Sequence, residues 1–181
     1  MFGFTGCNDK NSNTDFEVTN TAVINIKDYG EIELELYGKV APITVENFVT
    51  LAKDVFYDGL TFHRIIEGFM IQGGDPEGTG MGGSDKNIKG EFRVNGVDNN
   101  IKHLRGVISM ARNGYSYDSA SSQFFIMHED APHLDGQYAA FGKVVKGIEV
   151  VDAVAENTPV TDGNGTVLRQ NQPVIEKITI K

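Results

Sequence analysis

The stretch TFHRIIEGFMIQGG, residues 61–74, decides the expected fold and site of this 181-residue chain. It consists of two short apolar runs, rich in β-branched and aromatic residues, that meet at Glu67 and Gly68. Runs of this composition are typical of half-buried β-strands. A three-residue turn centred on Gly68, which tolerates a positive φ, predicts a hairpin in which Arg64 is paired with Gln72.

Arg64 is an unusual residue to find inside such a strand. An arginine is almost never buried without a partner, so its head group either reaches solvent or faces a ligand. Because strand side chains alternate between faces, Arg64, Met70 and Gln72 are expected on one face of the hairpin. A cation, a thioether and an amide side by side indicate a binding site. A solvated arginine on an edge strand is the alternative.

The composition is that of one globular domain, with 40% hydrophobic and 23% charged residues. The net charge of -9 argues against nucleic acid as a partner, because it repels phosphate backbones. A single cysteine, Cys7, excludes an intrachain disulfide, and the four histidines lack the spacing of zinc ligands. We therefore expect no metal and no cofactor.

The first residues differ from the rest of the chain. Residues 1–17 are expected to be a disordered N-terminal segment, and residues 18–181 the folded domain. The sequence FTGC that ends at Cys7 resembles the end of a bacterial lipoprotein signal, although no basic segment precedes it. Two locations therefore stay open. Cys7 anchors an extracytoplasmic lipoprotein if Met1 lies inside a truncated signal, or the protein is cytoplasmic and soluble.

Hydrophobic alternation predicts a mainly β fold, and helical spacing predicts two helices, at residues 42–56 and 147–155. Antiparallel strands of this number hide their edges best by closing into a barrel, so we expect a closed eight-stranded antiparallel β-barrel capped by two α-helices. The glycine-rich segment 75–90 lacks the ending of a phosphate-binding loop and is interpreted as a surface loop. The strands are expected at residues 21–27, 31–37, 61–66, 70–74, 106–111, 123–128, 139–146 and 173–180, with a further short strand at 91–94.

Five blocks follow one another along the chain: AP with TVENF (41–48), FHRIIEGFMIQGGD (62–75), GVISMA (106–111), SQFFI (122–126), and LDG (134–136) followed by FGKV (141–144). In this order they resemble the cyclophilin family of peptidyl-prolyl cis-trans isomerases. The resemblance runs from about residue 21 to residue 180, and the loop at 78–83 is similar to that of bacterial and archaeal members. It implies the capped eight-stranded barrel, isomerase activity on X–Pro bonds and a role in protein folding.

Rotation about an X–Pro bond breaks amide resonance against a barrier of about 18–20 kcal/mol. No bond is made or cut, so the reaction requires no nucleophile, base or metal. It requires a donor for the prolyl nitrogen, whose lone pair localises as the amide twists, and that interaction exists only in the transition state. An arginine suits this task because it is always charged and presents fixed donors.

By resemblance, Arg64 is the catalytic residue, and the other site residues bind the substrate. Gln72 and Gln123 are expected to fix Arg64 and the substrate carbonyl. For His63, the strand alternation leaves a structural role open. The proline pocket is expected from Phe69, Met70, Phe125 and Leu134, backbone pairing from Ala111 and Arg112, and further contacts from His63, His133 and Tyr138.

Three positions depart from the family pattern. His133 stands where many eukaryotic members have tryptophan, a main contact of the immunosuppressant cyclosporin, so weak cyclosporin binding at most is expected. Tyr138 replaces a histidine that is usual in eukaryotic members, and keeps an aromatic wall with a polar tip. The loop at residues 115–118 differs from the usual one, which affects contacts with the segments that flank the proline.

The expected partners are proline-containing unfolded or flexible polypeptides, and the chain is expected to be a monomer. One alternative is a binding module that holds such a segment without useful turnover. Another is a barrel that carries an apolar ligand, which is disfavoured because the family's barrel interior is filled by side chains. Four residues taken together favour the active enzyme, namely Arg64, Gln72, Phe69 and Phe125.

Overall fold

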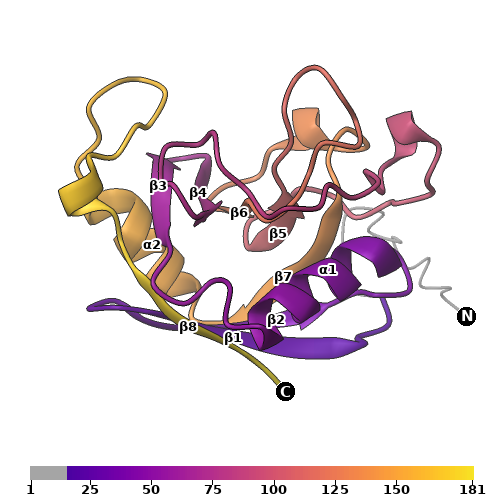
Figure 1. Ribbon diagram of the computed structural model, residues 1–181, viewed down its shortest axis with the longest axis horizontal. Helices are drawn as coiled ribbons and strands as arrows, with labels where there is room; N and C mark the ends of the chain where they lie inside the picture. Colours follow the sequence, from indigo (N-terminus) through magenta and orange to yellow (C-terminus); the bar gives the residue numbers. More distant parts are fainter. Residues whose placement is uncertain (1–15) are drawn as a thin grey trace, which may run out of the picture.

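A strongly curled antiparallel sheet with two α-helices accounts for residues 16–181, the part of the chain that the computed structural model describes (Figure 1). The helices are α1 (Pro42–Lys53) and α2 (Ile148–Asn157), and short 3-10 turns occur at η1 (Arg93–Asn95), η2 (Pro132–Leu134) and η3 (Arg169–Asn171). The strands are β1 (Asn20–Ile26), β2 (Gly30–Leu36), β3 (Thr61–Ile66), β4 (Met70–Asp75), β5 (Val107–Met110), β6 (Phe124–Met127), β7 (Ala140–Lys146) and β8 (Ile175–Ile180).

The strand order is β3-β4-β6-β5-β7-β2-β1-β8, which leaves β3 and β8 as the outer strands. The curl brings these two strands together at a short seam. Thr61 forms a bridge with Val174, and the Phe62 amide donates to the Pro173 carbonyl at 2.9 Å. The expected eight-stranded antiparallel fold is confirmed. The sheet closes through a few hydrogen bonds between β3 and the segment that leads into β8, and not through a continuous ladder of strand pairing.

The β3–β4 hairpin has the predicted register. Arg64 lies opposite Gln72, and Ile66 lies opposite Met70. Gly68 adopts a φ of 76°, which side chains other than glycine rarely tolerate. The local turn chemistry therefore fixes which side chains of the two strands share a face.

The core fills the concave side of the sheet, and the two helices cover its open ends (Figure 1). The ring of Phe48, from α1, lies 5.3 Å from Tyr57, 5.6 Å from Phe124 and 5.3 Å from Phe141, measured between ring centroids. Val151 and Val154 of α2 are fully buried in the same core. The described interior is thus packed with side chains, which argues against a carrier for an apolar ligand.

Helix α1 is capped from a distant part of the chain. Its N-cap residue, Ala41, makes no side-chain capping bond, and Thr44 lies inside the helix. The buried Glu91 carboxylate caps it, accepting hydrogen bonds from the Ile43 amide at 3.1 Å, the Thr44 amide at 2.7 Å and the Thr44 hydroxyl at 2.6 Å. A negative group at this position also suits the positive end of the helix dipole.

Two predicted elements are wrong in detail. The short strand expected at 91–94 is absent from the described structure, which has the 3-10 turn η1 there, because Glu91 turns toward α1. Helix α1 ends at Lys53 and not at residue 56, and the next residues form a turn in which Val55 has a φ of 61°. Both differences arise from tertiary contacts that local periodicity does not report.

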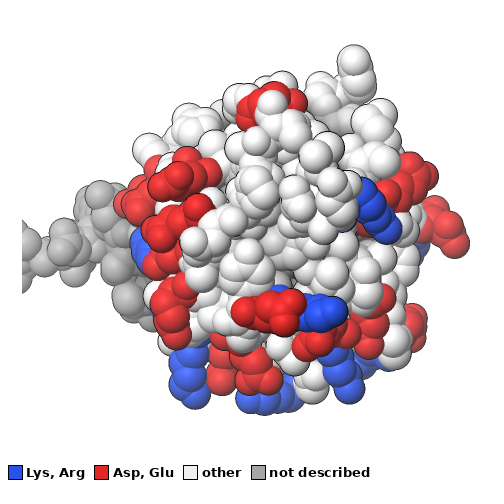
Figure 2. Space-filling model, turned by 90° about the vertical axis from the view of Figure 1, so that its left-hand side faces the viewer, with Lys and Arg blue, Asp and Glu red and all other residues white. Residues whose placement is uncertain are grey.

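Charged side chains on the face shown in Figure 2 lie mainly around its margin, and uncharged side chains occupy its centre. The acidic and basic residues are interspersed, so this face offers no broad basic surface for a nucleic acid. In residues 16–181 no helix combines the length and apolarity that crossing a bilayer requires. Cys7 and all but the last two residues of the expected N-terminal segment 1–17 lie outside the described residues.

We predict that Glu91→Ala lowers the free energy of unfolding by roughly 2–3 kcal/mol, because it removes a charged cap and leaves helix amides unpaired. Chemical denaturation measures the change. Glu46→Ala, on the exposed face of the same helix, is the matched control and is expected to change stability little. Equal stability of the two variants would contradict the capping role.

Candidate active site

A row of directly opposite residues crosses four strands on the outer face of the sheet. Arg64 of β3 is paired with Gln72 of β4, Gln72 with Phe125 of β6, and Phe125 with Ser109 of β5. Opposite residues of an antiparallel pair point to the same face. The row therefore aligns a cation, an amide and an aromatic ring along one surface.

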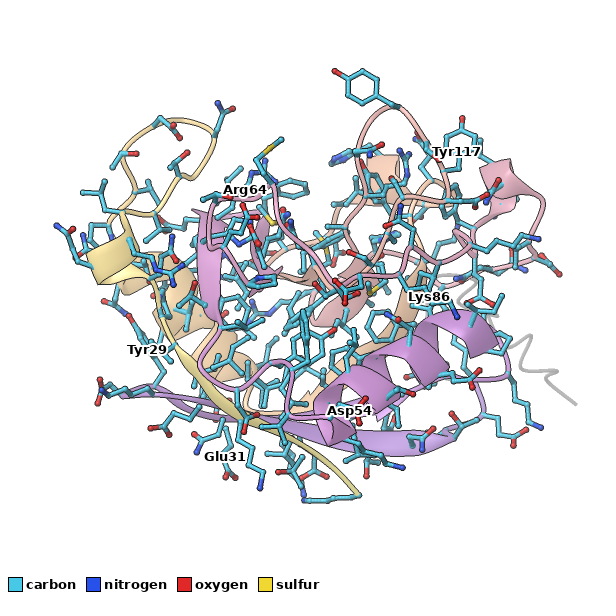
Figure 3. All side chains as sticks on the ribbon, viewed as in Figure 1. Tyr29, Glu31, Asp54, Arg64, Lys86 and Tyr117 are labelled. Atoms are coloured by element: carbon cyan, nitrogen blue, oxygen red, sulfur yellow. The ribbon has the colours of Figure 1, made fainter. Side chains whose placement is uncertain are left out.

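A hollow of about 210 Å³ opens above this row. Six apolar or aromatic side chains line it together with the polar side chains of Arg64, Gln72 and Arg112. Figure 3 labels Arg64 on β3. The volume lies below the roughly 300 Å³ typical of the smallest sites for drug-sized ligands, so the hollow suits a single small ring. The lining residues are Arg64, Phe69, Met70, Gln72, Ala111, Arg112, Phe125, Leu134 and Tyr138.

Two contacts fix the guanidinium of Arg64. Its Nε donates to the backbone carbonyl of Asn164 at 2.9 Å, and its Nη1 donates to Oε1 of Gln72 at 3.2 Å. Within residues 16–181, Nη2 makes no hydrogen bond. Arg64 therefore keeps a donor free while two others hold its plane in place.

Gln72 is itself held by a chain of amides. Its Nε2 donates to Oε1 of Gln123 at 2.9 Å, and Nε2 of Gln123 donates to the carbonyls of Gly80 at 3.0 Å and Gly82 at 2.7 Å. This chain also settles the amide orientations, because each oxygen must face a donor. The glycine-rich loop thus acts on Arg64 through two glutamines.

A buried carboxylate organises that loop. Asp75 accepts hydrogen bonds from the amides of Glu77 at 2.8 Å, Thr79 at 3.0 Å and Gly80 at 2.6 Å. Burial alone would raise the pKa of Asp75, but the backbone hydrogen bonds outweigh it and lower the pKa below the usual range. The glycine-rich loop that follows β4 is therefore folded around the ionised carboxylate of Asp75. Its carbonyls at Gly80 and Gly82 accept hydrogen bonds from Gln123.

Arg112 separates the hollow from a second, polar groove of about 410 Å³. Its guanidinium lies over the rings of Tyr138 at 4.6 Å, Tyr117 at 5.1 Å and Phe92 at 5.4 Å. Cation–π contacts of this kind hold a long side chain in one position. The groove shares Gln72, Ala111 and Arg112 with the hollow and gives room for chain that flanks a bound ring.

The structure gathers nine of the twelve predicted site residues around the hollow, and places Gln123 in the adjoining groove. His63 and His133 do not line the hollow. His63 is buried beside the Asp75 loop, and neither of its ring nitrogens has a hydrogen-bond partner within the described residues. His133 is exposed, and its ring lies 5.7 Å from that of Phe69.

Sequence reasoning missed His103, which supports the floor of the hollow. Its ring stacks on Phe125 at 6.1 Å, its Nδ1 lies 3.2 Å from Oδ1 of Asp135, and its Nε2 lies 3.1 Å from Oγ of Ser109. Burial lowers the pKa of His103, against the opposing effect of Asp135. The order of these side chains resembles a hydrolase triad, but Ser109 is 0% exposed and reaches no substrate.

The hollow contains in its lining an arginine held at two points, and together with the polar groove beside it has room for one small ring and for chain that flanks it. Residues 21–181 match the family of "Cyclophilin type peptidyl-prolyl cis-trans isomerase/CLD". The chain belongs to this family and has peptidyl-prolyl cis-trans isomerase activity. The resemblance seen in the sequence is thereby confirmed.

Two bacterial relatives and one solved structure illustrate the similarity. A peptidyl-prolyl cis-trans isomerase of Helicobacter pylori is 49% identical over 143 residues, 77% of this chain and 84% of the relative. Peptidyl-prolyl cis-trans isomerase B of Bacillus subtilis is 50% identical over 129 residues, 71% and 86% of the respective chains. A cyclophilin-type isomerase of Cryptosporidium parvum, crystallised in the presence of the dipeptide Ala-Pro, has a TM-score of 0.78 and 33% identity, over 89% of this chain and 98% of that one.

We predict that the free energy of unfolding falls between about pH 7 and pH 5, because two buried histidines have lowered pKa values. The unfolded chain takes up protons near the ordinary histidine pKa of about 6.5, while the folded chain resists them. For His63, burial is the main cause, Arg64 adds to the lowering, and Asp75 opposes it.

Denaturant titrations at a series of pH values measure this dependence. His63→Phe removes one titrating group at little change in volume, so its stability is expected to fall less with acid than that of the parent chain. An identical pH slope in the two proteins would show that His63 titrates alike in the folded and unfolded states.

Proposed function

We propose that Arg64 is the catalytic residue of this isomerase and that the hollow beside it binds the proline ring. The supporting observation is the free Nη2 donor of a guanidinium held at two other points, on a residue that lines a hollow of about 210 Å³ beside Phe69, Met70 and Phe125. A substrate proline in the hollow brings its ring nitrogen to this rim. Arg64 then donates to that nitrogen as the amide twists.

The free energies show what each part contributes. A millionfold acceleration corresponds to about 8 kcal/mol. One charged hydrogen bond from Arg64 supplies roughly 1.5–3 kcal/mol, which is too little alone. The remainder comes from holding the proline ring and the flanking chain in a twisted geometry. Phe69, Met70, Phe125 and Leu134 hold the ring in this proposal.

The remaining site residues grip the chain on either side of the proline. Gln72 and Gln123 orient Arg64 and bind the substrate carbonyl, and the strand end at Ala111 and Arg112 pairs with the peptide backbone. Tyr138 forms part of the wall through its ring, which lies 5.8 Å from that of Phe125. His133 borders the site through Phe69, and His63 lies beside the Asp75 loop, whose carbonyls hold Gln123.

We further infer that the substrates are proline-containing segments of unfolded or flexible polypeptides, so that the enzyme assists protein folding. The hollow and its groove lie on the outer surface of the sheet, where an extended segment of a larger chain has access. Slow X–Pro exchange, which takes tens to hundreds of seconds, is a frequent limit on folding.

We predict that Arg64→Ala lowers kcat/KM for an X–Pro peptide by roughly ten- to a hundredfold, the equivalent of one charged hydrogen bond. Arg64→Lys keeps the charge but loses the planar donors, so it should recover little activity. A protease-coupled isomerisation assay measures both. Wild-type rates in Arg64→Ala would refute the catalytic role, and binding without turnover in the parent chain would contradict the activity.

We also predict that cyclosporin binds weakly and that His133→Trp raises its affinity about tenfold, because a larger aromatic surface would then stand beside Phe69. Titration of the drug against both proteins by calorimetry or fluorescence gives the two Kd values. His133→Phe, which has a smaller ring, is the control. Tight binding by the parent chain would contradict this assignment.

A further inference from the structure

The contact between Arg64 and Asn164 comes from a loop with no other part in the site. Residues 158–168 connect α2 to η3, and the Asn164 carbonyl accepts the Arg64 Nε hydrogen bond at 2.9 Å. A backbone carbonyl holds its direction only as well as the loop that carries it. The features that shape this loop therefore bear on the direction of the guanidinium.

Asp162 shapes the loop. Its Oδ1 accepts hydrogen bonds from the amides of Asn164 and Thr166, both at 3.0 Å, and its Oδ2 accepts one from the Thr166 hydroxyl at 2.8 Å. The Gly165 amide donates to the Asp162 carbonyl at 3.1 Å. The exposed Asp162 carboxylate thus bonds the backbone amides before and after the Asn164–Gly165 peptide bond, whose carbonyl contacts Arg64.

The far side of the loop is attached to β3 itself. The Ile65 amide donates to the Gly165 carbonyl at 2.8 Å, and the Val167 amide donates to the His63 carbonyl at 3.0 Å. A Cβ at Gly165 would lie 2.1 Å from the Ile65 carbonyl oxygen, so only glycine permits this approach. The loop is therefore fixed to the strand that carries Arg64, and Asp162 sets the shape of its tip.

We propose that Asp162 is a positioning residue for the isomerase reaction, which acts by holding the Asn164 carbonyl against Nε of Arg64. This inference rests on the catalytic role proposed for Arg64. Arginine has several rotatable bonds, and a single anchor through Gln72 would leave the guanidinium free to turn about that contact. The second anchor fixes the plane, and with it the direction of the free Nη2 donor.

Asp162 does not line the hollow or the polar groove, so it affects the reaction only through the loop. The backbone hydrogen bond from Thr166 is the main reason why the pKa of Asp162 is lowered. The carboxylate therefore stays ionised at neutral pH, where it accepts all three hydrogen bonds.

The test compares Asp162→Ala with Asp162→Asn. We expect Asp162→Ala to lower kcat roughly five- to tenfold, with KM nearly unchanged, because the donor is misdirected while the hollow is intact. Asp162→Asn keeps an oxygen that accepts both amides and should restore most of the rate. Glu156→Ala, which removes an exposed charge at the end of α2, is the matched control and should leave kcat unchanged.

Two further measurements separate positioning from a general structural effect. The Nε proton of Arg64, observed by NMR, should exchange with water several-fold faster in Asp162→Ala than in the parent chain. Adding Asp162→Ala to Arg64→Ala should cause no further loss of activity, because the two residues act through one donor.

The outcomes are distinct for the two proposals. If Arg64→Ala retains wild-type activity, the catalytic role fails. If Arg64→Ala is impaired while Asp162→Ala has a normal kcat and normal Nε exchange, the catalytic role stands and the positioning role is overturned. Additive losses in the double variant would also overturn it.

Discussion

The two hydrogen bonds that hold the guanidinium of Arg64 beside the hollow are the interactions on which the account of the site depends. β3 is an outer strand of the sheet, where an arginine would ordinarily extend into solvent. Here the seam with residues 173–175 and the loop around Asn164 close that edge. The curl of the sheet then sets Phe125 across from the cation, so that a small ring can lie between them.

Much of the polar structure around the hollow serves to keep that geometry rigid. Asp75 accepts hydrogen bonds from the backbone of the glycine-rich loop, and a carbonyl of that loop accepts one from Gln123. The ring of His103 stacks on that of Phe125. Arg112 is held among three aromatic rings. A reaction that makes and breaks no covalent bond gains from such rigidity, because its rate depends on how well a twisted amide fits the site.

The features that the sequence predicts well are those with local causes. Gly68 and the alternation of side chains determine the register of the β3–β4 hairpin, so the shared face of Arg64 and Gln72 follows from residues 61–74 alone. Strand order does not follow, because the pairing of β4 with β6 depends on contacts across about fifty residues. Glu91 is a second feature that local sequence does not predict. The pattern around it indicates a strand, but in the structure its carboxylate accepts hydrogen bonds from the amides of α1.

The site shows a similar division. Phe69 and Gln123 belong to motifs that can be recognised in the sequence, so the sequence alone predicts that they lie at the site, and they line the hollow and its groove. Asn164 contributes only its backbone carbonyl, which any residue carries, so no side-chain signal marks it. The positions of His63 and His133 outside the hollow depend on loop packing that a family motif does not report.

The most direct test of the central claim is a crystal structure of the chain with an X–Pro peptide bound. The account predicts the proline ring in the hollow against Phe125, with a guanidinium nitrogen of Arg64 within about 3.5 Å of the prolyl nitrogen or close enough to reach it as the amide twists. A proline ring bound elsewhere, or an Arg64 head group turned away from it, would contradict the account.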